Sequence, residues 1–199
     1  MSAAPARLST LSRSIDGEVA IVTGAASGMG RATAHLFADE GARVVVADLD
    51  PARVEAVVDE VRTVHGDDRA LGVPCDVGDI AALRALVAAT VDWGGRLDIV
   101  VNNAGISLIN TSFMDEAEFE ENWARTLDVN LTAHVRLIRL ALPHLIESGV
   151  GRIVNIASTE SIVATAGLSA YAATKAGVTG LTRRRTAPPW RRSIRSRRC

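Results

Sequence analysis

Short apolar runs alternate with longer stretches of helical periodicity along most of the chain. Five runs are nearly continuous in apolar residues, as expected of strands buried on both faces, and they lie at 19–23, 43–47, 70–75, 97–101 and 152–156. The stretches between them have the spacing of amphipathic helices, and they lie at 28–40, 51–65, 79–93 and 115–148, with a further helix from Ser169 onward. This alternation is typical of a parallel sheet covered by helices. The sequence therefore predicts an α/β fold, with a doubly wound, Rossmann-like parallel sheet.

The pattern ends after the helix that begins at Ser169. Residues 183–199 contain eight arginines, two adjacent prolines and no acidic residue, a composition that does not continue a buried strand. We therefore expect the sheet to be truncated after its fifth strand and the following helix. The 199 residues are the length of one domain. The expected organisation is a disordered N-terminal extension at 1–16, an incomplete folded domain at 17–182 and an Arg-rich tail at 183–199.

Charge separates the folded part from the tail. Residues 1–182 carry 14 basic and 23 acidic side chains, a net charge of −9, whereas residues 183–199 carry +8. An acidic folded part argues against nucleic acid or an anionic membrane as its main partner. Arginine outnumbers lysine 21 to 1, which is typical of a GC-rich gene, so we expect the tail to be the product of a reading-frame shift. The alternative is a basic arm that binds nucleic acid.

Cysteine use and hydropathy indicate the compartment. Cys75 and Cys199 have neither the spacing of a disulfide framework nor that of metal ligands, which fits a reducing compartment. No apolar stretch approaches 18 residues, and residues 1–14 lack the apolar region of a secretory signal. We expect a cytoplasmic protein without a metal site and without a membrane partner.

A glycine-rich turn follows the first predicted strand and leads into a helix. Glycines there allow backbone N–H groups and the helix N-terminus to approach a pyrophosphate. Asp48 follows the second strand, 18 residues beyond Gly30, where a carboxylate can bind both ribose hydroxyls and repel a 2′-phosphate. The pattern favours NAD over NADP, and Asp76 could meet the adenine edge. The alternatives are a tight helix–strand contact at the glycines, a helix cap at Asp48 and a cap or turn residue at Asp76.

Four polar residues are candidates for catalysis. Tyr171 and Lys175 are the single tyrosine and lysine of the chain, and at a spacing of four they share one helix face, so the ammonium would stabilise the phenolate. Ser158 follows the fifth strand, 13 residues before Tyr171, and its hydroxyl could polarise a carbonyl or be an ordinary strand-end group. Asn130 interrupts an apolar helical stripe, where a buried amide needs a partner. Its alternative role is to hold a neighbouring backbone.

In this order the motifs resemble the short-chain dehydrogenase/reductase family, in the subgroup with Thr-Gly-x-x-x-Gly-x-Gly and Tyr-x-x-x-Lys. The resemblance covers about residues 17–182 and includes Asp76-Val77 and the segment 102–105, Asn-Asn-Ala-Gly. It implies an oxidoreductase that transfers a hydride between NAD(H) and a secondary alcohol or ketone. Tyr171 is then the general acid/base, Lys175 assists it and holds the nicotinamide ribose, Ser158 orients the reacting oxygen, and Asn130 holds a water.

The same resemblance implies a set of cofactor contacts and a substrate wall. The wall is formed by 106–113 and 159–168, which are mostly small and apolar. The implied cofactor contacts are Thr23, Gly24, Ser27, Gly28, Met29, Gly30, Asp48, Leu49, Asp76, Val77, Asn103, Ala104, Gly105, Tyr171 and Lys175.

Complete members of the family continue with a sixth strand, a Pro-Gly turn, a substrate loop and a seventh strand, and commonly form homo-oligomers. The tail shows none of these features. Two alternatives to the enzyme therefore stand, a catalytically inactive cofactor-binding fragment and a nucleic-acid interaction module built on the tail. Without a sixth strand, the fifth is expected to be an exposed edge with apolar faces.

Overall fold

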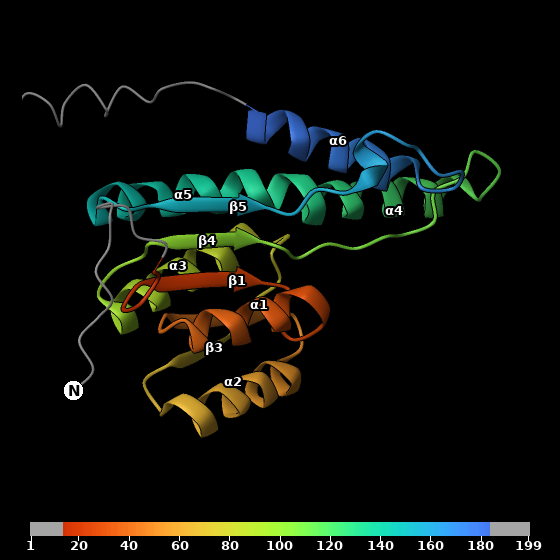
Figure 1. The fold of residues 1–199 in the computed structure, drawn as a ribbon. Helices are drawn as coiled ribbons and strands as arrows, with labels where there is room; N and C mark the ends of the chain where they lie inside the picture. The colour runs from red at the N-terminus through yellow and green to blue at the C-terminus, as the bar shows by residue number, and fades with distance from the viewer. Residues whose placement is uncertain (1–13, 184–199) are drawn as a thin grey trace, which may run out of the picture. The chain divides into compact units, whose positions relative to one another are not determined.

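Five strands form one sheet in the computed structural model, which describes residues 14–183. The order across the sheet is β3-β2-β1-β4-β5, and β1 pairs in parallel with β2 and β4, as β2 does with β3 (Figure 1). The strands are β1 (Val19–Thr23), β2 (Arg43–Asp48), β3 (Ala70–Pro74), β4 (Ile99–Asn102) and β5 (Arg152–Asn155). The prediction of a doubly wound parallel sheet is confirmed.

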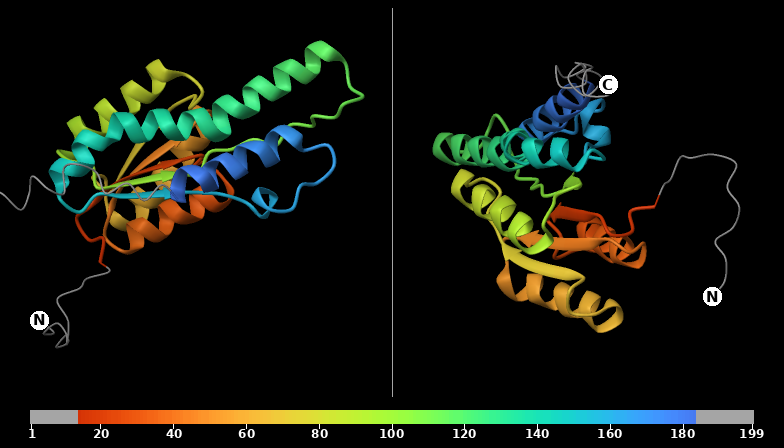
Figure 2. Two further views of the ribbon diagram at one scale, coloured as in Figure 1. Left: turned by 90° about the horizontal axis from the view of Figure 1, so that it is seen from above. Right: turned by 90° about the vertical axis from the view of Figure 1, so that its left-hand side faces the viewer.

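Helices connect the strands as the periodicity predicted, and Figure 2 shows α1 and α3 on opposite sides of the strands. The helices are α1 (Gly28–Asp39), α2 (Pro51–His65), α3 (Ile80–Gly94), α4 (Glu116–Leu127), α5 (Ala133–Ser148) and α6 (Ser169–Arg183). Aspartates accept N–H bonds at the starts of α2, α3 and α4, which fixes where these helices begin. The stretch predicted as one helix at 115–148 is α4 and α5 joined by a π-helical turn, η1 (Asp128–Thr132).

The fold divides into two compact units. The first contains the residues up to Ala104 together with Arg136–Val154, and the second contains Gly105–Val135 and the residues from Asn155 onward. In the first unit, Val44 and Val46 of β2 are fully buried in one apolar cluster with residues of α1 and α2, and this cluster includes Ala25 and Ala26 of the glycine-rich turn.

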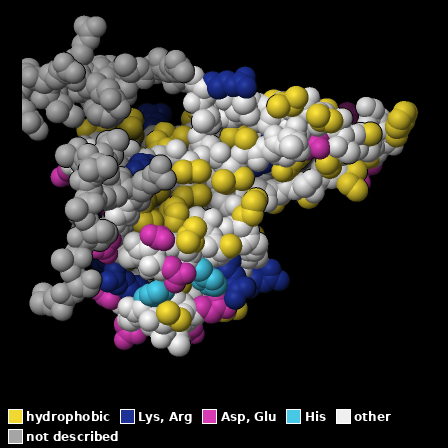
Figure 3. All heavy atoms as spheres, viewed as in Figure 1, with side chains coloured by type: hydrophobic (Ala, Val, Ile, Leu, Met, Phe, Trp, Pro, Cys, Tyr) yellow, Lys and Arg dark blue, Asp and Glu magenta, His cyan; other side chains and the backbone are white. Residues whose placement is uncertain are grey.

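Ion pairs join α1 to α2 on the outside of the first unit. Glu60 of α2 binds Arg31 and His35 of α1, and His65 of α2 lies 2.8 Å from Asp39 of α1. Figure 3 shows charged and histidine side chains gathered over these two helices. Each side chain in these pairs is more than a quarter exposed, so the pairs contribute little to stability and mainly orient the two helices.

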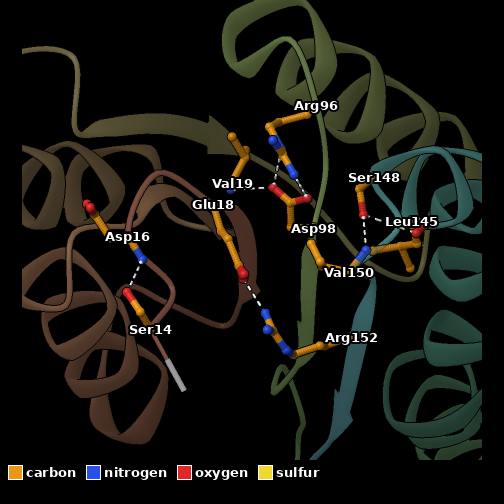
Figure 4. A network of polar contacts seen from close by, with 10 residues as sticks. All are labelled: Ser14, Asp16, Glu18, Val19, Arg96, Asp98, Leu145, Ser148, Val150 and Arg152. Carbon is orange, nitrogen blue, oxygen red and sulfur yellow. Dashed lines mark hydrogen bonds and ion pairs between the residues drawn. The ribbon is translucent and has the colours of Figure 1, made fainter. Parts of the chain in front are cut away.

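A buried carboxylate ties together the amino ends of β1 and β4 (Figure 4). Asp98 is fully buried and accepts bonds from the Val19 backbone N–H at 2.9 Å and from two nitrogens of Arg96 at 2.7 Å each. Its own carbonyl accepts a bond from the backbone N–H of Arg152, whose side chain pairs with Glu18. Three strands are therefore fastened at the end of the sheet opposite the glycine-rich turn.

β5 is the last strand of the described sheet, and its faces are exposed. Ile153 and Val154 keep 37% and 44% of their accessible surface. The expected exposed apolar edge is confirmed.

Between residues 14 and 183 no helix combines the length and the apolar character needed to cross a membrane. The expected extension at 1–16 lies outside the described residues except for its last three positions, among which Ile15 packs against the core cluster. The tail at 183–199, with its frame-shift and nucleic-acid interpretations, also lies outside them except for Arg183.

Candidate active site

The glycines of the turn after β1 are not all needed for the same structural reason. A Cβ on Gly24 would lie 2.8 Å from the Cα of Ala104, and one on Gly30 would lie 2.1 Å from the carbonyl oxygen of Gly24 and 2.5 Å from Nδ2 of Asn103. Gly28 has a φ of +51°, yet no atom lies within 4 Å of the place where its Cβ would be. Gly24 and Gly30 are therefore required by close packing, whereas Gly28 adjoins open space.

Thr23 and Asn103 build the turn from the ends of β1 and β4. The Asn103 amide donates to the carbonyls of Thr23 at 2.8 Å and Gly24 at 3.1 Å. The Thr23 hydroxyl accepts from the backbone N–H groups of Asn103 at 3.0 Å and Ala104 at 3.1 Å, and donates to the Val101 carbonyl at 3.3 Å. The structure thus brings these predicted cofactor residues together, and their polar groups hold the turn itself.

The first turn of α1 presents its backbone to solvent. Ser27 is the N-cap residue and has extended φ and ψ, but its side chain makes no capping hydrogen bond. Ser27, Gly28 and Met29 are exposed, and the first turn contains no acidic residue. Together with the open space beside Gly28, this helix start fits an anionic group such as a pyrophosphate.

Asp48 connects the end of β2 to the same turn. One carboxylate oxygen accepts from the backbone N–H of Ala26 at 3.0 Å, and the other accepts from the N–H of Leu49 at 2.7 Å. Asp50 caps α2, so the alternative of a helix cap at Asp48 is wrong. The carboxylate is half-buried beside the turn, and the Leu49 side chain is 63% exposed.

Asp76 closes the turn after β3. Its side chain accepts from the backbone N–H of Gly78 at 2.9 Å, which is the turn role that was left open, and Val77 is buried. Burial first, and then the charges of Asp76 and Asp79, raise the pKa of the Cys75 thiol to about 11. This thiol stays protonated and unreactive near neutral pH.

The second unit carries Tyr171 and Lys175 on α6, on one face as predicted. The Lys175 ammonium lies 5.6 Å from the centroid of the Tyr171 ring. Only 3% of Lys175 is exposed, and its Nζ donates to the Ile156 carbonyl at 2.8 Å. Burial lowers the pKa of Lys175 because an ammonium loses hydration there.

Ser158 lies where β5 leads into a short 3₁₀ turn, η2 (Thr159–Ser161). Its hydroxyl accepts from the Glu160 backbone N–H at 3.2 Å and caps this turn. Ser161 donates to the carbonyls of both Ser158, at 2.6 Å, and Lys175, at 3.0 Å. The Ser158 backbone is therefore linked to the helix that carries Lys175.

Asn130 lies inside the π-helical turn η1 and is fully buried. Its Oδ1 accepts from the Ile106 backbone N–H, and its Nδ2 donates to the Ile106 carbonyl, both at 2.8 Å. Nδ2 also lies 3.4 Å from the Thr174 hydroxyl on α6. The Asn130 side chain thus holds a neighbouring backbone, which is the alternative role.

The two segments expected to form a substrate wall expose apolar side chains. Ile109 and Phe113 belong to the first segment and Ile162 and Val163 to the second, and all four are at least 66% exposed. Gly105, which precedes the first segment, is exposed as well.

Sequence reasoning missed three residues of the second unit: Asn110 and Ser169, which bond to each other, and Thr174, which contacts Asn130. The signal that could have found Thr174 is its place directly before Lys175 on the small-residue face of α6. Asn110 and Ser169 give no local signal, because polar residues in loops and at helix starts are ordinary.

Comparisons with known proteins agree with this arrangement. A family model described as short chain dehydrogenase matches residues 18–195, past residue 182 and into the segment expected to be an unrelated tail. The 2,5-dichloro-2,5-cyclohexadiene-1,4-diol dehydrogenase of Sphingobium indicum is 43% identical over 81% of this chain and 63% of its own length. The trans-4-hydroxycyclohexanecarboxylate dehydrogenase of Sinomonas cyclohexanicum is 39% identical over 88% of this chain and 68% of its own.

A solved 7α-hydroxysteroid dehydrogenase, in complex with NADH and 7-oxo glycochenodeoxycholic acid, superposes with a TM-score of 0.78 at 32% identity, covering 84% of this chain and 63% of that one. The chain spans 63–68% of the length of these three proteins. The matched residues contain the glycine-rich turn, Asp48 and the Tyr171–Lys175 pair. The chain belongs to the short-chain dehydrogenase/reductase family, whose members include these dehydrogenases of alcohols.

Proposed function

We propose that the protein is an NAD-dependent oxidoreductase that interconverts a secondary alcohol and its ketone, with Tyr171 as the general acid/base. The observation that carries the proposal is the buried Lys175 ammonium beside the Tyr171 ring. When bound, NAD supplies the hydride acceptor. The residues of the chain then have to bind it, hold the substrate oxygen and accept its proton.

Tyr171 performs the proton transfer. In the oxidation direction its phenolate would take the proton from the substrate hydroxyl, and the carbinol carbon would become the ketone carbon by giving its hydride to the acceptor that bound NAD would supply. The nearby Lys175 ammonium stabilises the phenolate. Ser158 orients the substrate oxygen with its O–H, because accepting from the Glu160 backbone N–H at 3.2 Å does not use the hydroxyl hydrogen.

The turn after β1 and Asp48 hold the adenosine and pyrophosphate of the cofactor. The exposed start of α1 and the open space beside Gly28 would take the phosphates, and the Asp48 carboxylate would take the ribose hydroxyls. A 2′-phosphate would meet the same negative charge, so NAD is preferred over NADP.

The exposed apolar walls favour an apolar substrate body. Ile109, Phe113, Ile162 and Val163 offer hydrophobic contact, and the three proteins compared above act, by their names, on ring alcohols or a ring ketone. We therefore propose a secondary alcohol or ketone with an apolar body as the substrate, and ring alcohols as the first compounds to test.

Tyr171→Phe tests the assignment of the acid/base. Turnover of cyclohexanol or 4-hydroxycyclohexanecarboxylate with NAD should fall at least a hundredfold, while the Kd for NADH, measured by fluorescence titration, should not change. Thr179→Ala is the matched control, because it removes another α6 hydroxyl, whose bond goes to the backbone carbonyl of Lys175 and not to its ammonium, and it should keep turnover. Retained turnover in Tyr171→Phe would overturn the assignment.

Asp48→Asn tests the cofactor preference. Asparagine keeps an acceptor for the Ala26 N–H but removes the charge, so the ratio of kcat/KM for NAD over NADP should fall about tenfold or more. An unchanged ratio in a variant with wild-type thermal stability would mean that Asp48 only holds the turn.

A second candidate function is cofactor binding without turnover. Two observations favour it: apolar residues of β5 are exposed, and the chain spans 63–68% of the length of the three proteins compared above. NADH binding by the unmodified chain with no turnover of any tested alcohol would support this candidate over the enzyme.

A further inference from the structure

Asn110 is a buried polar junction in the second unit. Only 2% of it is exposed, and its backbone and side chain both make hydrogen bonds. Its backbone N–H donates to the Gly167 carbonyl at 2.8 Å, and its Nδ2 donates to the Phe119 carbonyl at 3.0 Å. The Ser169 hydroxyl lies 3.0 Å from its carbonyl oxygen and 2.7 Å from its Oδ1. A buried amide with this many partners fixes the position of the segments it joins.

These bonds hold the residues that lead into α6. Leu168 and Asn110 form an isolated parallel β-bridge, and Ser169 is the first residue of α6. Tyr171 lies two residues farther on, within the first turn of this helix. The start of α6 is therefore held to the loop after β4 immediately before the tyrosine.

A second buried asparagine holds the same loop and the same helix on the other side of Tyr171. Asn130 binds the backbone of Ile106 twice and reaches the Thr174 hydroxyl, three residues after the tyrosine. The segment 106–110 is thus held at both ends. It is joined to α6 directly by Ser169, before Tyr171, and through Asn130 by Thr174, after Tyr171. A first helical turn without such contacts frays.

We propose that Asn110 is a positioning residue that acts through Ser169 and sets where the Tyr171 hydroxyl lies. The inference rests on the proposed function, because it assigns a role in placing the acid/base. Asn110 contacts no reacting atom by itself. Its effect is on kcat, since a displacement of about 1 Å at a catalytic group can lower the rate about a hundredfold.

Ser169→Ala is the decisive variant, because it removes the donor to Asn110 and leaves the buried asparagine in place. We expect kcat to fall about ten- to a hundredfold, with KM for NAD and the Kd for NADH unchanged, and the acid/base limb of the pH–rate profile to shift. Ser169→Thr keeps the hydroxyl and should restore kcat and the pH–rate profile. Thr179→Ala, which loses a hydroxyl bond to the Lys175 backbone carbonyl and no contact with Ser169, should leave kcat and the pH–rate profile unchanged.

A double-mutant cycle tests whether Asn110 acts through Ser169. Asn110→Ser combined with Ser169→Ala should be no slower than the slower single variant, because the two residues act as one unit. Additive effects, or a Ser169→Ala variant with the kcat and pH profile of the unmodified protein, would overturn the proposal.

The same variants distinguish an error in the proposed function from an error in the positioning role of Asn110. If Tyr171→Phe is inactive while Ser169→Ala is fully active, only the positioning role is wrong. If the unmodified chain has no turnover, amide hydrogen exchange decides. Exchange in the first turn of α6 should then be at least tenfold faster in Ser169→Ala than in Thr179→Ala, and equal exchange would refute the fastening by Asn110.

Discussion

A methyl group on Gly30 should disrupt the glycine-rich turn without any ligand being involved. In Gly30→Ala the new Cβ would be 2.1 Å from the Gly24 carbonyl oxygen and 2.5 Å from the Asn103 amide nitrogen. Neither atom moves freely, because one is backbone and the other donates to two carbonyls of the turn. Gly30 and the turn therefore have to separate by about 1 Å, which strains or breaks the Asn103 bonds.

The expected loss of stability follows from these contacts. Overpacking costs about 1–3 kcal/mol, and two weakened hydrogen bonds cost about 1 kcal/mol each. Alanine is about 1 kcal/mol better than glycine inside a helix, and Gly30 is in the first turn of α1. The net loss in the free energy of unfolding is about 3 kcal/mol, which lowers Tm by roughly 6–12 °C for a chain of this size.

Gly28→Ala is the matched control, two residues away in the same turn. Its methyl would meet no atom within 4 Å, so only the positive φ of +51° opposes it, at about 1–2 kcal/mol. The same methyl occupies the space that we assign to the cofactor phosphates. We expect a smaller drop in Tm than for Gly30→Ala, together with at least a tenfold rise in the Kd for NADH.

Thermal and urea unfolding followed by circular dichroism, with NADH titration by fluorescence, measure both effects. The order of the two variants is the test. A Gly30→Ala protein within 1 kcal/mol of the unmodified one, or a Gly28→Ala protein that is the less stable of the two, would refute the packing argument. A Gly28→Ala protein with unchanged NADH affinity would refute the phosphate site beside Gly28.

Two further predictions concern stability. Asp98→Ala leaves the Val19 N–H and Arg96 without their buried partner and should lower the free energy of unfolding, measured in urea, by about 3 kcal/mol. Glu60→Ala removes an exposed ion pair and should lower it by less than about 1 kcal/mol. Equal losses in the two variants would contradict the role of burial. Because burial lowers the pKa of Lys175 below its ordinary 10.5, the folded chain releases this proton before the unfolded chain does. Stability should therefore rise with pH in the window below 10.5, relative to Lys175→Met, and parallel curves for the two proteins from pH 8 to 10.5 would rule this out.

The sequence predicted the elements of the first unit closely because their signals are local. β1 and α2 have the predicted bounds, since the Val-rich run of one and the Asp50-Pro51 start of the other are read from neighbouring residues. The helix predicted at 115–148 was correct as a helix, but its π-helical turn was not foreseen. That turn contains Asn130, whose partner Ile106 lies 24 residues away, so no local pattern could place it.

The candidate site shows the same division between local and distant causes. Thr23, Asn103 and Gly30 were predicted as cofactor contacts from a motif, yet the structure uses them to build the turn, by hydrogen bonds or by close packing. Open space adjoins Gly28, and solvent reaches the start of α1.

A motif therefore combines two requirements that a sequence alone cannot separate. Residues that form the turn are needed whether or not a nucleotide binds, and substituting them lowers stability and affinity together. Residues beside the open space can lower affinity while the fold persists. Gly30 and Gly28 represent the two kinds, because the atoms around them differ although both are glycines of one eight-residue motif. The contacts of each position, and not its membership of the motif, decide which measurement reports on function.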